Sequence, residues 1–137
     1  MKVPFTSLRI FRIRHSNSAQ VRNEAQQALA VDLTNTEMLL TLGVAFYELG
    51  NHAQAVEALH KNVDLLTQRG MSDGSNLSMY AYGQYWLGCA LASANHIEEA
   101  HTAWNISLDA YKRLIPDDRR RRRIREVKSI HTLMDGK

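Results

Sequence analysis

Two segments of the chain carry the same pattern of small and large residues, 45 positions apart. The pair Leu42-Gly43 recurs as Leu87-Gly88. Twelve residues after each glycine stands an alanine, and four residues after each alanine stands a large apolar side chain. These pairs are Ala55 and Ala100, then Leu59 and Trp104, with polar turns at 50–52 and 95–96. A constant internal offset predicts two copies of one supersecondary unit.

The residue types in each copy predict two helices that cross closely. A glycine lets two backbones approach where a Cβ would clash, so we expect Gly43 and Gly88 at the crossings. The alanines are their small partners. The space between the helices would be filled by Phe46, Leu59, Leu91 and Trp104. Two prolines and seven glycines in 137 residues also suit long helices.

This pattern resembles the tetratricopeptide repeat (TPR), whose signature places Leu-Gly before an aromatic residue and a later Ala-x-x-x-Phe. The resemblance rests on residues 42–46 with Ala55 and Leu59, and on residues 87–91 with Ala100 and Trp104. The offset of 45 exceeds the usual 34 residues, which looks like the long-helix variety of the family. The helix-ending proline is missing, and Leu33 stands where it is expected after the first block.

The resemblance implies an all-α fold, a TPR-like α-solenoid of about three antiparallel helix pairs plus a C-terminal capping helix. We expect one domain over 1–137, with a degenerate first repeat at 1–35, repeats at 36–70 and 75–115, and a basic capping helix at 116–137. Apolar spacing predicts helices at about 18–32, 36–49, 52–69, 76–94, 97–114 and 118–134. Residues 4–14 can be either a helix or an extended arm.

The first and last predicted helices each carry one apolar stripe. In the first, small or apolar residues fall at Val21, Ala25 and Ala28. In the last, the stripe consists of Ile124, Val127, Ile130 and Leu133 or Met134. A single apolar stripe on a polar helix is the form expected of a helix that packs on one side only.

The family places its binding groove on the first helix of each pair, and this implies a concave, aromatic peptide-binding groove. Its residues would be Glu37, Leu40, Thr41, Val44 and Tyr47 in the first copy, and Tyr82, Tyr85, Trp86, Cys89 and Ala92 in the second. Such a surface suits an apolar or amphipathic segment of a partner protein. The alternative is that the same aromatic stripe belongs to the core.

One variant of the family grips acidic C-terminal tails with Asn, Lys and Arg side chains in the groove. The corresponding positions here hold Thr41, Val44, Trp86 and Cys89, and none can pair with a carboxylate as Lys or Arg does. We therefore expect no binding of acidic tails of that kind.

Charge is distributed unevenly along the chain. Residues 1–23, 24–118 and 119–137 carry net charges of +5, −8 and +6, which gives the total of +3. The C-terminal basic patch consists of Arg119, Arg120, Arg121, Arg122, Arg123, Arg125 and Lys128. It could bind nucleic acid phosphates, or basic ends could dock on the acidic centre of a second copy. No aromatic residue interrupts the run, so stacking on single strands is not indicated.

Catalysis finds little support in the sequence. His96 and His101 flank two glutamates but stand five residues apart, whereas zinc proteases need four, so we expect no metal. Cys89 is the only cysteine and lies in mid-helix, where a free, half-buried thiol is expected. No phosphate-binding glycine loop or nucleophile elbow occurs. We therefore predict a protein without enzymatic activity or cofactor.

The sequence favours a cytoplasmic location, because the first twenty residues lack the unbroken apolar core of a secretory signal. Their arginine-rich, acid-free composition keeps mitochondrial targeting as an alternative. Residues 74–97 contain no charged side chain but too many polar ones for a membrane span. The function predicted from all these features is that of a non-catalytic protein–protein interaction module, a scaffold, adaptor or chaperone-like protein. A nucleic-acid-associated protein is the alternative.

Overall fold

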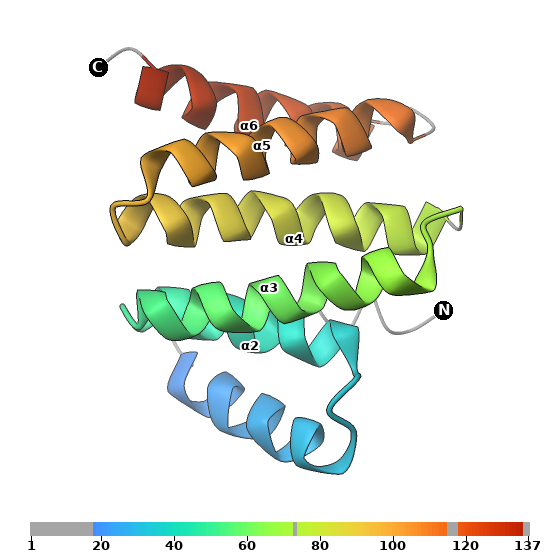
Figure 1. Ribbon diagram of the computed structural model, residues 1–137, viewed down its shortest axis with the longest axis vertical. Coiled ribbons are helices and arrows are strands. Elements are labelled where there is room, and N and C mark those ends of the chain that lie inside the picture. The colour runs from blue at the N-terminus through green and yellow to red at the C-terminus, as the bar shows by residue number, and fades with distance from the viewer. Residues whose placement is uncertain (1–17, 73, 115–117, 136–137) are drawn as a thin grey trace. The chain divides into compact units, whose positions relative to one another are not determined.

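The computed structural model describes residues 18–72, 74–114 and 118–135, and every regular element in them is a helix (Figure 1). A first helix covers residues 18–31. It is followed by α2 (Thr36–Glu48), α3 (His52–Arg69), α4 (Gly74–Ser93), α5 (Ile97–Arg113) and α6 (Asp118–Asp135). The all-α prediction is confirmed, and the predicted helix boundaries agree to within two residues. The segment 4–14 lies outside the described residues.

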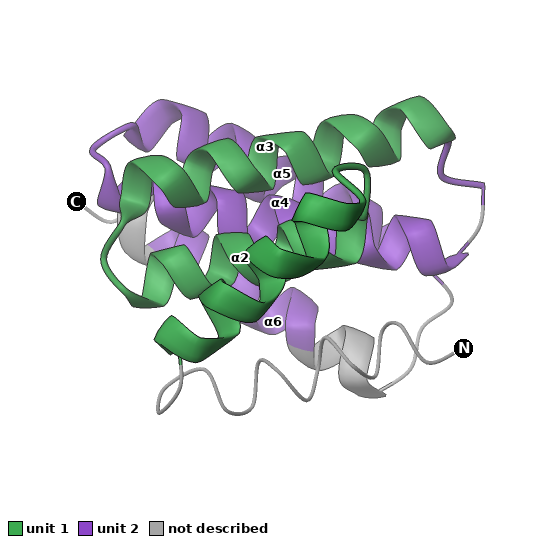
Figure 2. Cartoon of the chain, turned by 90° about the horizontal axis from the view of Figure 1, so that it is seen from below, with its two compact units in different colours: residues 1–69 green, residues 70–137 purple. Residues whose placement is uncertain are grey.

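The chain divides into two compact units, residues 1–69 and 70–137 (Figure 2). The described part of the first unit contains the helix 18–31, α2 and α3. The second contains α4, α5 and α6. The division falls at the end of the first predicted repeat, 36–70, where Gly70 has a φ of +87°.

In the first unit, α2 and α3 form a helical hairpin that closes around Gly43. A Cβ built on Gly43 would lie 2.5 Å from Cγ of Leu59, and Leu59 is fully buried. Ala55 is also fully buried. One further bond ties the two helices: the Asn62 amide donates to the backbone oxygen of Thr36 at 2.7 Å. The predicted close crossing at Gly43 is confirmed.

In the second unit, α4 and α5 repeat this construction 45 residues later. The indole of Trp104 fills the space beside Gly88, and a Cβ there would lie 2.5 Å from Cδ1 of the ring. Ala100 is fully buried. The hydroxyl of Ser107 donates to the backbone oxygen of Ala81 at 2.7 Å. Ser107 and Ala81 correspond to Asn62 and Thr36, so the sequence repeat is also a repeat of interhelix contacts.

The turns inside the two hairpins have the same backbone geometry. Gly50 and Asn95 occupy equivalent positions and have positive φ angles of 83° and 70°. The amide of the next residue bonds back across each turn, from Asn51 to Phe46 and from His96 to Leu91, both at 2.8 Å. This is the Schellman pattern that ends a helix with a left-handed residue.

The outer helices pack through single stripes, as their sequences indicate. The helix 18–31 buries Val21, Ala25 and Leu29. We predicted Ala28 in this stripe, but Ala28 is only half-buried and the longer Leu29 takes the third position. On α6, Val127 is fully buried and lies between the half-buried Ile124 and Ile130.

The connection from the first helix to α2 is fixed by polar contacts. The Thr34 hydroxyl and backbone N–H donate to the Asp32 carboxylate at 2.7 and 3.0 Å, and they hold the pKa of Asp32 below its ordinary value. The Arg69 guanidinium donates to the Thr34 carbonyl at 2.6 Å. Asn35 caps α2 by accepting from the Met38 N–H at 3.1 Å. These bonds hold the turn that carries Leu33.

Candidate protein-binding surfaces

The aromatic residues predicted for the second copy form one cluster on α4, which we call the aromatic face (Tyr82, Tyr85, Trp86 and Cys89). Their spacing of three and four residues brings them to one side of the helix. Trp86 meets Tyr85 and Tyr82 edge to face, with ring centroids 5.3 and 6.2 Å apart. Tyr82 is half-buried, whereas Tyr85 and Trp86 are 8% and 7% exposed. Tyr82 is therefore the most exposed of these three aromatic residues.

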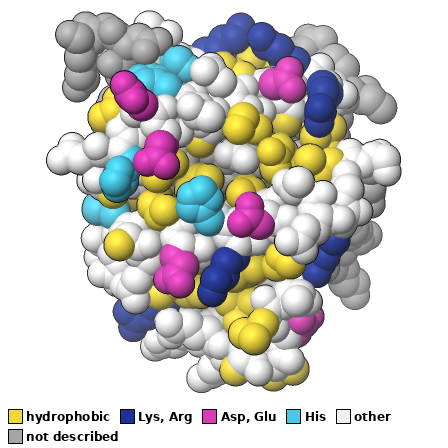
Figure 3. Space-filling model, in the orientation of Figure 1, with side chains coloured by type: hydrophobic (Ala, Val, Ile, Leu, Met, Phe, Trp, Pro, Cys, Tyr) yellow, Lys and Arg dark blue, Asp and Glu magenta, His cyan; other side chains and the backbone are white. Residues whose placement is uncertain are grey.

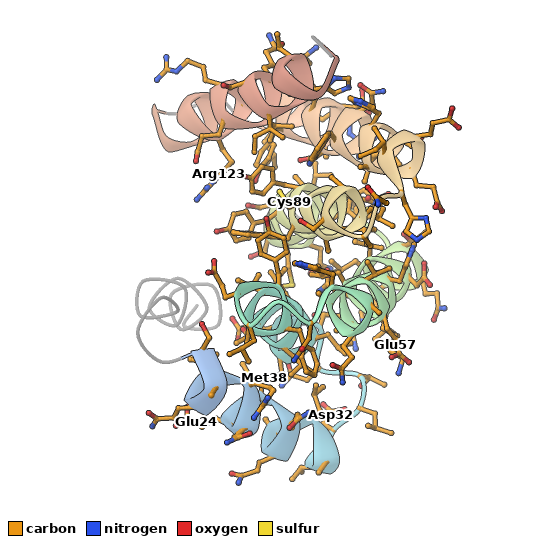
Figure 4. The ribbon with its side chains drawn as sticks, turned by 90° about the vertical axis from the view of Figure 1, so that its left-hand side faces the viewer. Glu24, Asp32, Met38, Glu57, Cys89 and Arg123 are labelled. Atoms are coloured by element: carbon orange, nitrogen blue, oxygen red, sulfur yellow. The ribbon has the colours of Figure 1, made fainter. Side chains whose placement is uncertain are left out.

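The last helix contributes a cation to this cluster. The guanidinium of Arg123 lies 4.6 Å from the centroid of the Tyr82 ring, within the range of a cation–π interaction. The same guanidinium forms an ion pair with Glu126, with 3.1 Å between Arg123 Nη1 and Glu126 Oε1. Figure 4 shows Arg123 reaching from α6 toward the rings of α4. One arginine of the basic run is thus used in contacts within its own unit.

The other predicted basic residues are distributed differently. Arg125 and Lys128 are exposed on α6. The side chains of Arg119, Arg120, Arg121 and Arg122 lie outside the described residues. In the described part of the basic patch, two exposed cations therefore remain available for the predicted contacts with negative charge.

Burial changes the acidity of the groups around the aromatic face. Desolvation raises the pKa of Cys89 to about 11 and raises the pKa values of Tyr85 and Tyr111 above their ordinary range. The Cys89 side chain is 8% exposed, which makes it more buried than the half-buried thiol expected from the sequence. It stays protonated near neutral pH and lacks the thiolate character of a reactive cysteine.

The residues predicted for the first copy lie along α2. Leu40, Thr41 and Val44 are at most 3% exposed, and Glu37 is 6% exposed. Tyr47 is half-buried, and the centroid of its ring lies 5.6 Å from the centroid of the His52 ring. In both sets a half-buried tyrosine, Tyr47 or Tyr82, stands beside side chains that are buried.

A recess that the sequence did not indicate lies in the first unit. It has a volume of about 510 Å³ and is formed by the end of the first helix, α2 and α3. Its apolar lining includes Leu29, Leu33, Leu39, Leu42, Phe46 and Leu65. The missing helix-ending proline was the signal that could have drawn attention to it, because Leu33 occupies that place and forms part of the lining.

Of the two histidines singled out in the sequence, His101 contacts the neighbouring helix α6. The rings of His101 and His131 lie 4.6 Å apart between α5 and α6, and His131 Nε2 lies 2.9 Å from Asn105 Oδ1. His96 precedes α5, and its Nδ1 lies 3.5 Å from Glu99 Oε1. Within the described residues, no three His, Cys, Asp or Glu side chains are grouped so that they could hold a metal ion.

Comparisons with known proteins returned no match among family models, curated proteins or solved structures. Among the helices of the described segments, none combines the length and apolar character needed to cross a bilayer. This includes α4, whose 20 residues cover most of the uncharged stretch noted in the sequence.

Proposed function

We propose that the protein is a non-catalytic interaction module of the TPR type, which holds an apolar or amphipathic segment of a partner protein. The proposal is carried by the construction shared by the two hairpins. In both, a glycine meets a large buried side chain, a polar side chain bonds the facing helix, and a left-handed residue closes the turn. Helix-pair repeats of this kind stack into extended binding surfaces.

The residues that we expect a partner to contact first are Tyr47 and Tyr82. Both residues are half-buried, so each keeps part of its surface open to solvent while the rest is held by neighbours. Tyrosines held in this way contribute strongly to binding, because little conformational freedom is lost on association. Buried neighbours such as Val44 and Trp86 would support these rings from behind.

A display selection of amphipathic helical peptides against the whole chain tests this function. Peptides enriched on the wild type are measured against Tyr47→Ser and Tyr82→Ser, with Tyr80→Ser as the matched control. Tyr80 is also half-buried on α4 but lies outside the predicted set. We expect at least about a tenfold loss for the first two variants, as for a hot-spot tyrosine, and little change for the control. Equal binding by all variants would contradict the proposal.

Nucleic-acid binding through the basic patch is the competing function, and salt separates the two. Contacts to phosphates weaken steeply with ionic strength. Binding through tyrosines responds far less to salt. A variant with Arg125→Gln and Lys128→Gln changes the two exposed cations of α6 and leaves the aromatic face intact. Loss of oligonucleotide binding in this variant, with peptide binding unchanged, would favour the competing function.

A further inference from the structure

Two apolar side chains beside the recess of the first unit are open to solvent, one at the end of the first helix and one in the turn after it. Val31 is 89% exposed and Leu33 is 76% exposed, and they are the most exposed of the large apolar side chains in the described residues. Single exposed apolar residues are common on protein surfaces. Here, however, Leu33 stands at the edge of an apolar recess, so that a projection and a hollow lie side by side. Together they make an apolar surface of the kind that marks interaction sites.

Leu33 is held in its exposed position. The residues on either side, Asp32 and Thr34, are joined by two hydrogen bonds, and Arg69 fixes the carbonyl of Thr34 at 2.6 Å. A side chain carried by a fixed turn loses less entropy when it docks than one on a mobile loop. The turn therefore presents Leu33 already positioned for contact.

The charged side chains beside the recess are arranged so that they can pair with the same residues of a second copy. Glu57, Lys61 and Asp64 follow one another along the exposed side of α3 and alternate in sign, and Lys61 Nζ lies 3.9 Å from Glu57 Oε2 of the same helix. If a second copy lies antiparallel along this helix, Lys61 of each copy can face Asp64 of the other. Apolar side chains reach the surface among charged ones in the lower part of Figure 3. Figure 4 shows Glu57 pointing outward from α3.

In a twofold interface the same patch of both subunits must be complementary to its own copy. The patch around the recess meets this requirement, because it combines a projection, a hollow and charges of both signs. We propose that the recess is the contact surface of a homodimer, in which Leu33 of each copy enters the recess of the other. Neither Tyr47 nor Tyr82 lines the recess, and the proposal does not depend on peptide binding.

Sedimentation velocity of the full chain over a wide concentration range tests the dimer. The wild type should shift from monomer to dimer as the concentration rises. Leu33→Asp should weaken the dimer by at least about tenfold, since the substitution removes apolar burial twice in each dimer. Leu49→Asp is the matched control, because Leu49 is the third exposed large apolar side chain and lies outside the recess. Circular dichroism checks that each variant is folded.

A charge exchange tests the orientation of the two copies. Lys61→Asp and Asp64→Lys should each weaken the dimer by placing like charges opposite one another, and the double variant should restore it. Both side chains are exposed, so neither change disturbs the core. A wild type that stays monomeric at all concentrations would overturn the proposal and leave the recess to another occupant. A dimer unaffected by Leu33→Asp would overturn it as well.

Discussion

The indole N–H of Trp104 donates to the backbone oxygen of Tyr85 at 3.2 Å, three residues before Gly88. The same ring fills the place that a side chain on Gly88 would take. The hydrogen bond holds the Trp104 ring in this place, and there is room for the ring because Gly88 has no side chain. In the first unit the smaller Leu59 stands in the equivalent position beside Gly43.

Gly88→Ala is therefore expected to destabilise the protein. Its Cβ would meet a ring that is 1% exposed and held by a hydrogen bond, so the ring must shift. Overpacking of this kind costs about 1–3 kcal/mol, although alanine is the better helix former. The free energy of unfolding in urea measures the effect.

Gly74→Ala is the control for this substitution. Gly74 begins α4, and nothing lies within 4 Å of a Cβ placed there. We expect unfolding at or slightly above the wild-type urea concentration. If Gly88→Ala proves as stable as Gly74→Ala, the contact with Trp104 is not tight.

Removing the interhelix hydrogen bond should destabilise both hairpins. Asn62 and Ser107 are fully buried, and each donates at 2.7 Å to a carbonyl of the facing helix. Asn62→Ala and Ser107→Ala should each cost about 1–3 kcal/mol, since a bond is lost in the interior. Thr102→Ala removes an exposed hydroxyl that bonds within its own helix and should cost under about 0.5 kcal/mol. Thermal unfolding of the three variants ranks these costs, and equal melting temperatures would refute the ranking.

The two turn positions should respond to substitution with opposite signs. Gly50 and Asn95 share a positive φ, which glycine adopts without strain and other residues adopt at a cost. Gly50→Ala should lower the free energy of unfolding by about 1 kcal/mol, and Asn95→Gly should leave it unchanged or raise it. Urea unfolding of both variants tests this. A loss of stability in Asn95→Gly would show that the asparagine side chain contributes more than its backbone conformation costs.

The raised pKa of Cys89 predicts a loss of stability in alkali. The unfolded thiol loses its proton near its ordinary pKa of 9.0, whereas the folded thiol keeps it until about 11. Between these values the folded state binds more protons, so the free energy of unfolding falls as pH rises. Below pH 9 the protonated Cys89 thiol makes its full contribution to the free energy of unfolding.

Cys89→Ala isolates this effect. The variant should start from a lower stability, because it leaves a small cavity, and show a shallower decline above pH 9. The buried Tyr85 and Tyr111, whose pKa values are also raised, maintain part of the slope at higher pH. Urea unfolding at a series of pH values measures both curves. Identical slopes for wild type and variant would contradict the assignment.

The sequence was sufficient to predict the helices and the construction of each hairpin. Gly43 and Gly88, with Leu59 and Trp104, could be matched because they lie at equal spacing in two copies. A contact between neighbouring helices depends on residues close together in the chain, and its pattern recurs with the repeat. The turns at Gly50 and Asn95 were predicted for the same reason.

Only the tertiary structure decided which of these side chains meet solvent. Tyr82 and Tyr85 share one helix face, yet Tyr85 is buried and Tyr82 is partly open with Arg123 against its ring. The sequence around Leu33 predicts only a turn, and the recess beside it forms when the surrounding helices pack. Helix spacing fixes the direction of a side chain, but its exposure depends on elements that are distant in sequence, and no local pattern encodes them.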